Sequence, residues 1–161
     1  MSTVEALLHA AKVRGVMLTT AESCTGGMLS TAITGIPGSS AIFDRGFVTY
    51  TNAAKMQMLG VNQATLDAHG AVSEEVAAEM AAGALRHSDA DFAVSITGIA
   101  GPGGSEHKPE GRVCFGLASA VGVTTETVEF GALGRDKVRA AARDHGITLF
   151  VKALESFVRV P

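Results

Sequence analysis

Two potential nucleophiles stand side by side in the segment TTAESCTGGMLSTAI, residues 19–33. Ser23 and Cys24 directly precede Thr25 and a glycine pair, and an apolar helical pattern follows. A side chain at a strand-to-helix turn lies beside unpaired backbone N–H groups, which can bind an oxyanion or a phosphate. The pattern is equally typical of a helix N-cap formed by Ser23 or Thr25. Residue spacing leaves three interpretations open: a serine nucleophile, a cysteine nucleophile and a cap.

A serine nucleophile needs a neighbouring base to take its proton. Lys55 follows the stretch VTYTNAA, just beyond a predicted strand, and can act as a base when its amine is neutral. Tyr50, the only tyrosine of the chain, ends the same strand, and its hydroxyl could orient or relay a proton. Lys55 could equally be a solvated helix residue. The 5 histidines are scattered without the spacing of metal ligands, so no metal site is predicted.

A second unusual loop, IAGPGGSEHKPEG at residues 99–111, follows a predicted strand that ends in SITG. The loop lacks the Gly-Lys-Ser/Thr of a Walker A motif, and Pro102 with no helical pattern behind it argues against a dinucleotide fingerprint. Free N–H groups in such a loop suit a small anionic ligand, although a plain surface loop is the alternative. The residues expected to bind ligand here are Thr97, Gly98, Gly101, Gly103 and Gly104.

The elements that must position these residues follow from hydrophobic periodicity and from turn residues. Helices are predicted over residues 3–14, 25–35, 52–59, 62–69, 73–87 and from 135 onward. Strands are predicted over residues 16–21, 42–50, 91–98, 112–120 and 123–130, with a hairpin turn at Val121-Gly122. Strands separated mostly by helices, with one hairpin, predict an α/β fold: a three-layer α/β/α sandwich on a five-stranded mixed sheet.

Composition narrows the class of protein. The chain has 161 residues, 47% of them hydrophobic, which is typical of a single folded domain spanning residues 1–161. The net charge of −3, without a basic stripe, predicts no nucleic-acid binding. Only 2 cysteines indicate a reducing compartment, and no apolar run is long enough to span a bilayer. We therefore expect a cytoplasmic protein without a membrane partner.

Several segments together resemble one known family. AESCTGG, GFVTYTNAAKMQMLGV, HGAVSEEVAAEMAAGAL and ADFAVSITGIAGPGG followed by KPEGRVCFGLA are similar to the C-terminal domain of the competence/damage-inducible CinA family, over residues 3–157. The resemblance implies a three-layer fold, a homodimer, and hydrolysis of the carboxamide of nicotinamide mononucleotide without a cofactor. It also implies that Ser23 is the nucleophile, assisted by Lys55 and Tyr50, with Cys24 a mere neighbour. The alternative is a non-catalytic nucleotide-binding or regulatory module on the same fold.

The expected mechanism is acyl transfer from a small-molecule nucleotide substrate. Neutral Lys55 takes the proton of Ser23, and N–H groups near Gly26 and Gly27 stabilise the oxyanion, with Thr25 beside them. The loop 98–104 and a helix dipole hold the 5′-phosphate, with Arg135 as a weaker contributor.

The chain departs from the family pattern at two positions. Glu110 stands where a small apolar residue is common, and Gly134 stands where Asp is usual, although Arg135 and Arg139 match. Lys108, on the same loop as Glu110, is expected to matter little.

Overall fold

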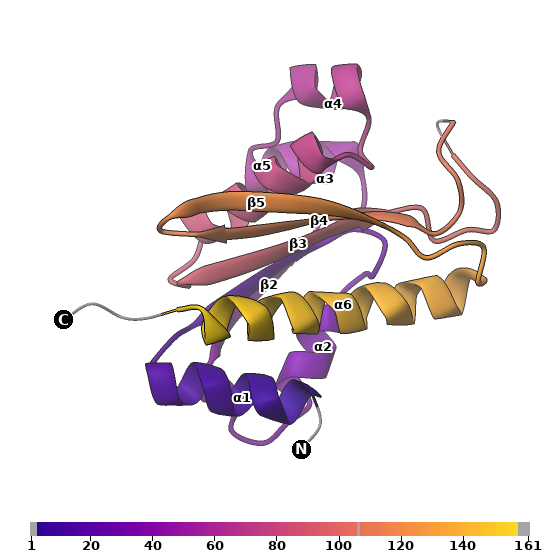
Figure 1. The fold of residues 1–161 in the computed structure, drawn as a ribbon. Coiled ribbons are helices and arrows are strands. Elements are labelled where there is room, and N and C mark those ends of the chain that lie inside the picture. The colour runs from indigo at the N-terminus through magenta and orange to yellow at the C-terminus, as the bar shows by residue number, and fades with distance from the viewer. Residues whose placement is uncertain (1–2, 106, 158–161) are drawn as a thin grey trace.

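One mixed sheet forms the middle of the molecule, with its strands in the order β2-β1-β3-β4-β5 (Figure 1). β1 pairs in parallel with β2 and β3, and β4 is antiparallel to both of its neighbours. The computed structural model describes residues 3–105 and 107–157. The strands are β1 (Leu18–Glu22), β2 (Phe43–Val48), β3 (Phe92–Gly98), β4 (Arg112–Ser119) and β5 (Gly122–Glu129).

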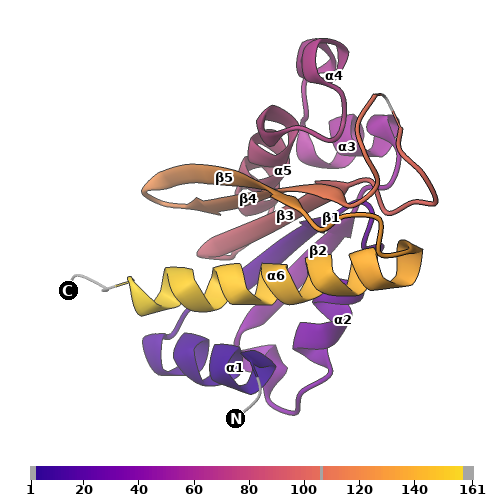
Figure 2. The ribbon, with the colours of Figure 1, turned by 45° about the vertical axis from the view of Figure 1, so that its right-hand side comes forward.

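Helices cover both faces of this sheet (Figures 1 and 2). One face carries α1 (Thr3–Arg14), α2 (Met28–Thr34) and α6 (Arg135–Glu155), which pack on one another. The other face carries α3 (Asn52–Leu59), α4 (Gln63–His69) and α5 (Glu74–Arg86), with α5 lying directly on the strands. A short 3₁₀ helix, Ser39–Ala41, precedes β2. The predicted three-layer α/β/α sandwich on a five-stranded mixed sheet is confirmed.

Two apolar cores, one on each face of the sheet, hold the layers together. The larger core joins α1, α2 and α6 to the strands through residues such as Leu29 and Phe150. The smaller core joins α3 and α5 to the other face and includes Leu59. A Cβ at Gly83 would overlap the carbonyl of Leu59, and a Cβ at Gly116 would lie 2.5 Å from the carbonyl oxygen of Ala77. Because neither glycine has a side chain, the backbone of α5 can lie directly against the backbone of α3 and of β4.

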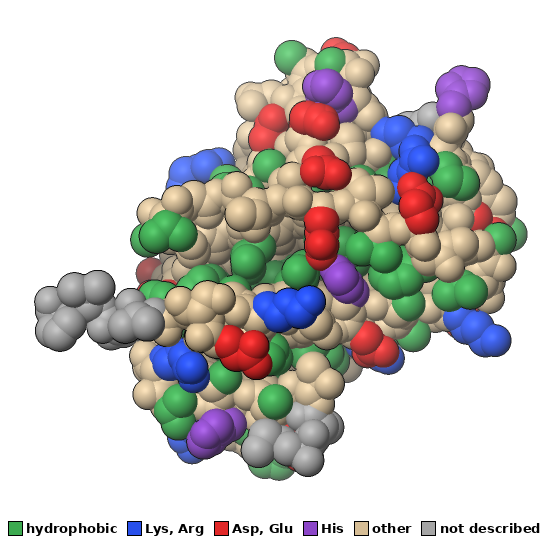
Figure 3. Space-filling model, in the orientation of Figure 1, with side chains coloured by type: hydrophobic (Ala, Val, Ile, Leu, Met, Phe, Trp, Pro, Cys, Tyr) green, Lys and Arg blue, Asp and Glu red, His purple; other side chains and the backbone are tan. Residues whose placement is uncertain are grey.

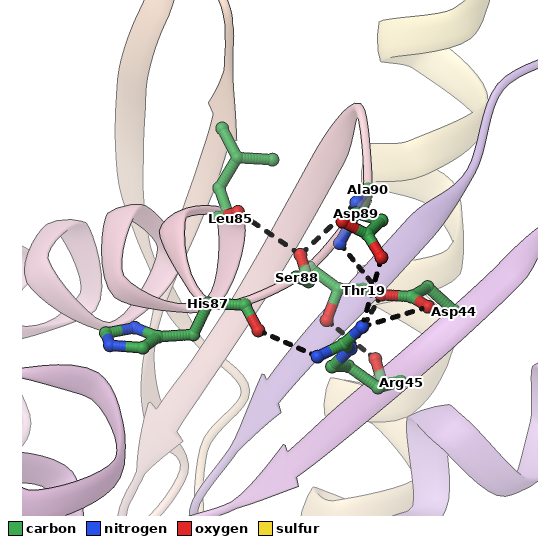
Figure 4. Close-up of polar contacts among 8 residues, drawn as sticks. All are labelled: Thr19, Asp44, Arg45, Leu85, His87, Ser88, Asp89 and Ala90. Carbon is green, nitrogen blue, oxygen red and sulfur yellow. Dashed lines mark hydrogen bonds and ion pairs between the residues drawn. The ribbon is translucent and has the colours of Figure 1, made fainter.

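An ionic cluster closes the end of the sheet where β3 begins (Figure 4). Arg45 of β2 donates through Nη1 to the carbonyl of His87 at 3.1 Å, and through Nε to Asp44 at 2.7 Å. The backbone N–H of Asp89 donates to Asp44 at 3.0 Å, and this bond, with that from Arg45, lowers the pKa of the Asp44 carboxyl. Edge strand β2 is thus tied to the loop between α5 and β3. The loops predicted to carry the site lie at the opposite end of the sheet.

Two element boundaries differ from the predictions. Helix α2 begins at Met28 rather than near residue 25, because Gly26 (φ 56°) and Gly27 (φ 107°) adopt left-handed backbone conformations that a right-handed helix excludes. The hairpin turn lies at residues 120–121, and Gly122 (φ 132°) already pairs with Ser119 across the two strands. The remaining predicted helices and strands are confirmed with small shifts at their ends.

The surface is mixed in charge. On the face seen in Figure 3, Lys and Arg side chains are scattered among acidic ones and form no continuous stripe. Across residues 3–105 and 107–157, the helices are all too short or too polar to cross a membrane.

Candidate active site

A pocket of about 350 Å³ lies beyond the carboxyl ends of β1 and β3. β1 lies between its parallel neighbours β2 and β3, so the connections that follow neighbouring strands run in different directions here. Open α/β sheets bind their ligands where the connections diverge in this way. Five segments supply the pocket wall: the turn after β1, the segment that leads into and begins α3, the loop between α4 and α5, the Gly-rich loop after β3, and the start of α6. Figure 2 shows the Gly-rich loop and the start of α6 at the same end of the sheet.

Ser23 extends β1 by one residue. Its backbone N–H donates to the carbonyl of Ile96 on β3 at 2.9 Å, and its side chain is only 8% exposed. The N-cap of α2 is Gly27, which makes no side-chain capping bond. The interpretation of Ser23 or Thr25 as the helix cap is therefore wrong, and the Ser23 hydroxyl lines the pocket instead.

Glu22 performs the capping task, and sequence reasoning missed it. Its buried carboxylate accepts hydrogen bonds from the backbone N–H of Leu29 at 2.9 Å and of Ser30 at 3.0 Å. The hydroxyls of Thr25 and Ser30 donate to the same carboxylate at 2.6 and 2.7 Å. A carboxylate near a helix N-terminus is also favoured by the helix dipole. Glu22 thus fixes the turn that presents Ser23; the only sequence signal was an acid at the end of a buried strand.

Lys55 projects from the first half of α3 into the protein. Thr51 caps this helix by accepting from the N–H of Ala54 at 3.0 Å. The Lys55 side chain is 1% exposed, and its Nζ lies 2.9 Å from Ser23 Oγ. Nζ also donates to the carbonyls of Thr49 at 3.0 Å and Tyr50 at 3.2 Å. The interpretation of Lys55 as a solvated helix residue is wrong, since the fold delivers its amine to Ser23.

Cys24 lines the same pocket but is poorly suited to act as a nucleophile. Burial raises the pKa of its thiol to about 11, an effect larger than those of the neighbouring charges. A thiol with such a pKa is protonated at neutral pH, whereas the thiolate is the reactive form. Of the two adjacent candidates, only Ser23 has a side-chain amine within hydrogen-bond distance.

Tyr50 approaches the site in a way that the sequence did not predict. Its carbonyl oxygen, rather than its hydroxyl, faces Lys55. The side chain is 58% exposed, and its hydroxyl accepts from Arg135 Nη2 at 2.9 Å. Arg135 Nη1 donates to the carbonyl of Gly101 at 2.7 Å. Tyr50 and Arg135 together form a side of the pocket next to the Gly-rich loop.

The Gly-rich loop lines the pocket as expected from its position after β3. Its lining residues include Thr97, Gly98, Gly101, Gly103 and Gly104, together with Arg135 from α6. Some polar groups of this set already have partners: the Thr97 hydroxyl donates to the carbonyl of Ala71 at 2.9 Å, and the Gly103 N–H donates to Glu110 at 2.7 Å. Lys108 Nζ donates to the carbonyls of His69 and Val72 at 2.7 and 2.5 Å. Lys108 therefore anchors this loop to the segment between α4 and α5, while the expectation that it matters little for activity stays a prediction.

Thr25, Gly26 and Gly27 do not line the pocket, contrary to the expectation from the sequence. Thr25 is buried and its hydroxyl bonds to Glu22. The N–H of Gly26 donates to the carbonyl of Ser23 at 3.1 Å, so it is not available to an oxyanion. Gly26 and Gly27 line a separate hollow beside Arg143. Arg139 of α6 braces this turn by donating through Nε to the Cys24 carbonyl at 3.0 Å.

Within the part of the chain that the structure describes, no three His, Cys, Asp or Glu side chains come together as they would around a metal ion. The polar groups at the pocket floor are instead a hydroxyl, an amine and backbone carbonyls, which suit proton transfer and nucleophilic attack.

Comparisons with known proteins agree with this fold. The family model described as the CinA C-terminal domain matches residues 1–154. Nicotinamide-nucleotide amidohydrolase PncC of Escherichia coli strain K12 is 52% identical over 158 residues, which cover 97% of this chain and 96% of that protein. The crystal structure of competence/damage inducible protein CihA from Agrobacterium tumefaciens matches with a TM-score of 0.90 and 45% identity, covering 97% of this chain and 98% of that one. The CinA superfamily protein KP700603 from Klebsiella pneumoniae matches with a TM-score of 0.92 and 35% identity, covering 98% and 100% of the two chains. The chain belongs to the CinA C-terminal domain family.

Proposed function

We propose that this protein hydrolyses the carboxamide of nicotinamide mononucleotide to nicotinate mononucleotide and ammonia, with Ser23 as the nucleophile and Lys55 as the base. The relative from Escherichia coli, which is 52% identical over nearly the full chain, is named as a nicotinamide-nucleotide amidohydrolase. The observation that carries the mechanism is the 2.9 Å separation between Lys55 Nζ and Ser23 Oγ in a buried setting. Such a pair fits acyl transfer, because the base lies within reach of the proton it must take.

The surroundings of Lys55 suit the neutral amine that a base requires. A neutral amine has two N–H donors and one lone pair. Once the amine is neutral, its two N–H groups can donate to the carbonyls of Thr49 and Tyr50, and its lone pair can face Ser23 Oγ, to which Nζ lies at 2.9 Å. Removal from water also disfavours the charged form of an amine. Tyr50 thus takes part through its backbone oxygen, in place of the proton relay expected of its hydroxyl.

The reaction then proceeds in two balanced halves. Ser23 Oγ attacks the carboxamide carbon while its proton passes to Lys55. The resulting tetrahedral intermediate collapses when the Lys55 ammonium returns the proton to the amide nitrogen, which leaves as ammonia. A water molecule attacks the acyl ester of Ser23, again giving its proton to Lys55. The ester bond breaks, Ser23 recovers its proton, and nicotinate mononucleotide is released.

The oxyanion donor proposed here differs from the N–H groups near Gly26 and Gly27 expected from the sequence, because the Gly26 N–H donates to the Ser23 carbonyl and both glycines line a separate hollow. We propose the backbone N–H of Cys24, the residue that follows the nucleophile. Over the described residues, this N–H makes no backbone–backbone hydrogen bond, and Cys24 lines the pocket. An N–H in this position stabilises the oxyanion in other enzymes with a nucleophile on a strand-to-helix turn.

The 5′-phosphate is assigned to the far end of the pocket, where Arg135 meets the Gly-rich loop. Arg135 supplies a fixed positive charge with donors in a planar fork, which suits phosphate. Gly101 and Gly104 supply backbone N–H groups for which the described structure records no backbone acceptor. This anion site and the Ser23–Lys55 pair lie in one pocket, as a substrate with a phosphate and an amide requires.

The direct test is release of ammonia from nicotinamide mononucleotide by the purified protein, with chromatographic identification of nicotinate mononucleotide. Equal amounts of the two products are expected. Tight binding of the nucleotide without ammonia release would instead support the non-catalytic module. A homodimer, which the family resemblance implies, and a cytoplasmic location, expected from composition, are part of the proposal, and light scattering of the purified protein tests the dimer.

A further inference from the structure

The carboxylate of Glu110 joins two segments of the pocket wall. Its Oε1 accepts from the N–H of Gly103 in the Gly-rich loop at 2.7 Å. Its Oε2 accepts from the N–H of Gly134, 24 residues away at the start of α6, at 3.1 Å. Glu110 itself does not line the pocket. It therefore lies behind the pocket wall, and the mechanism proposed above gives it no task.

The surrounding backbone leaves room for this carboxylate. A Cβ at Gly101 would lie 2.6 Å from the Glu110 carboxyl carbon, and Gly101 has the left-handed φ of 95° that favours glycine. The residue after Gly134 is Arg135, which donates to the carbonyl of Gly101. Two links therefore join the Gly-rich loop to the start of α6, one through the carboxylate of Glu110 and one through the guanidinium of Arg135.

We propose that Glu110 is a positioning residue that sets the Gly-rich loop against Arg135 and thereby determines how well the pocket binds the anionic group of its substrate. The inference rests on the proposed function, in which that group is the 5′-phosphate. A carboxylate can accept from both N–H groups at once. An amide has a single acceptor oxygen, so Glu110→Gln keeps the size of the side chain but loses one of the two bonds.

Repulsion between Glu110 and the substrate phosphate would have the opposite effect on binding. The negative charge of Glu110 lies near the proposed phosphate site, and its removal would improve phosphate binding if repulsion dominated. Asp136 provides a matched control, because it is an exposed acid in the first turn of α6. For the described residues, the structure records no hydrogen bond from the Asp136 side chain, so Asp136→Asn removes a nearby charge without removing a link.

Kinetics of Glu110→Gln, Glu110→Ala and Asp136→Asn with the mononucleotide and with nicotinamide riboside separate these effects. Loss of a hydrogen bond to a charged group predicts that KM for the mononucleotide rises about 10-fold in Glu110→Gln and further in Glu110→Ala. We expect kcat to stay within about 2-fold, because the Ser23–Lys55 pair is untouched. KM for the riboside, which has no phosphate, should not change, and Asp136→Asn should behave as the wild type. An unchanged or lowered KM for the mononucleotide in both Glu110 variants overturns the proposal.

Amide hydrogen exchange without substrate tests the same contact independently of turnover. The N–H groups of Gly103 and Gly134 should exchange faster in Glu110→Gln than in the wild type, and Asp136→Asn should leave both rates unchanged. If the wild type releases no ammonia, the proposed function fails, yet exchange still decides whether Glu110 holds the loop. If Glu110→Ala leaves the exchange rates at Gly103 and Gly134 unaltered, the positioning role is overturned, whatever the activity of the protein.

Discussion

The amine of Lys55 lies 2.9 Å from the hydroxyl of Ser23, although the two residues are 32 positions apart in the chain. Ser23 follows a central strand, and Lys55 comes from a helix on one face of the sheet. The contact exists because β1 and β2 are parallel neighbours, so that the segments leaving their carboxyl ends meet. Substitutions of the surrounding residues can test which groups hold this contact in place and which select the substrate.

Glu22 is expected to stabilise the turn that presents Ser23. In Glu22→Gln, an NH₂ group would face backbone N–H groups that now donate to the carboxylate. Leaving such buried groups unpaired predicts a loss of about 1–3 kcal/mol in the free energy of unfolding. Urea denaturation measures this loss, and Glu155→Gln, an exposed substitution on α6, is the control. Equal urea midpoints for the wild type and Glu22→Gln would mean that the carboxylate does not hold the turn.

The Cys24 thiol should be unreactive near neutral pH. Burial raises its pKa from 9.0 to about 11, so alkylation by iodoacetamide should be slow at pH 8 and should accelerate towards pH 11. Peptide mass spectrometry separates Cys24 from the buried Cys114. Fast alkylation of folded protein at pH 8 would reopen the possibility of a cysteine nucleophile.

The same pKa shift predicts how stability depends on pH. Between the two pKa values the unfolded chain binds fewer protons than the folded one, since only the unfolded thiol has ionised. The free energy of unfolding must therefore fall as pH rises through this window. Denaturation of wild type and Cys24→Ala between pH 8 and 11 should show a steeper fall for the wild type; parallel curves would contradict the shift.

Gly83 should control the position of Lys55 through the packing of α5 against α3. In Gly83→Ala the new methyl would overlap the carbonyl of Leu59, at the end of the helix that carries Lys55. We expect a loss of about 1–3 kcal/mol in stability, typical of overpacking, and a lower kcat. Thermal denaturation and ammonia release measure the two effects.

Gly146→Ala is the matched control, since it also adds a methyl inside a helix. There the methyl would lie 3.0 Å from a terminal methyl of Leu29 and 3.3 Å from that of Ile96, so it meets the ends of side chains rather than backbone. The gain in helix propensity, about 1 kcal/mol, offsets the crowding. If the two variants lose equal stability, the backbone contact at Gly83 has no special role.

Arg135 should distinguish the mononucleotide from nicotinamide riboside. Loss of its charge predicts a fall of about 10- to 100-fold in kcat/KM for the mononucleotide in Arg135→Ala, with little change for the riboside. Arg143→Ala, at a residue paired with Asp144 outside the pocket, is the control. Equal losses for both substrates would move the phosphate elsewhere. Gly101→Val would be a less direct test of phosphate binding, since its side chain would first meet Glu110.

Local signals in the sequence were sufficient for most of the fold. Ser73, which precedes two acids in the sequence, caps α5 by accepting from the N–H of Val76 and so begins the helix predicted from residue 73. Gly60 ends α3 in a left-handed conformation. Both features depend on residues within one helical turn, which is the range over which capping chemistry acts. The carboxyl ends of the parallel strands then predicted where the pocket lies.

Long-range contacts account for most of the features of the site that the sequence did not predict. The Glu22 cap acts across 7 and 8 residues and depends on how α2 folds back over β1. Tyr50 turns its hydroxyl to Arg135, 85 residues away, and offers only its carbonyl to Lys55. The N–H of Gly26 donates within a local turn, and residue types alone do not distinguish such an N–H from a free one. The Glu22 and Tyr50 contacts are fixed by tertiary packing, and the Gly26 bond by the conformation of a local turn, rather than by residue preference.

Ammonia release from nicotinamide mononucleotide by Ser23→Ala, measured beside Cys24→Ala and the wild type, tests the central claim most directly. Since Ser23 has the adjacent amine and Cys24 a protonated thiol, Ser23→Ala should lose about 10³-fold or more in kcat/KM. Cys24→Ala should keep most of the activity. A Ser23→Ala variant that releases ammonia at nearly the wild-type rate, or an inactive Cys24→Ala variant beside an active Ser23→Ala, would contradict the assignment of Ser23 as the nucleophile.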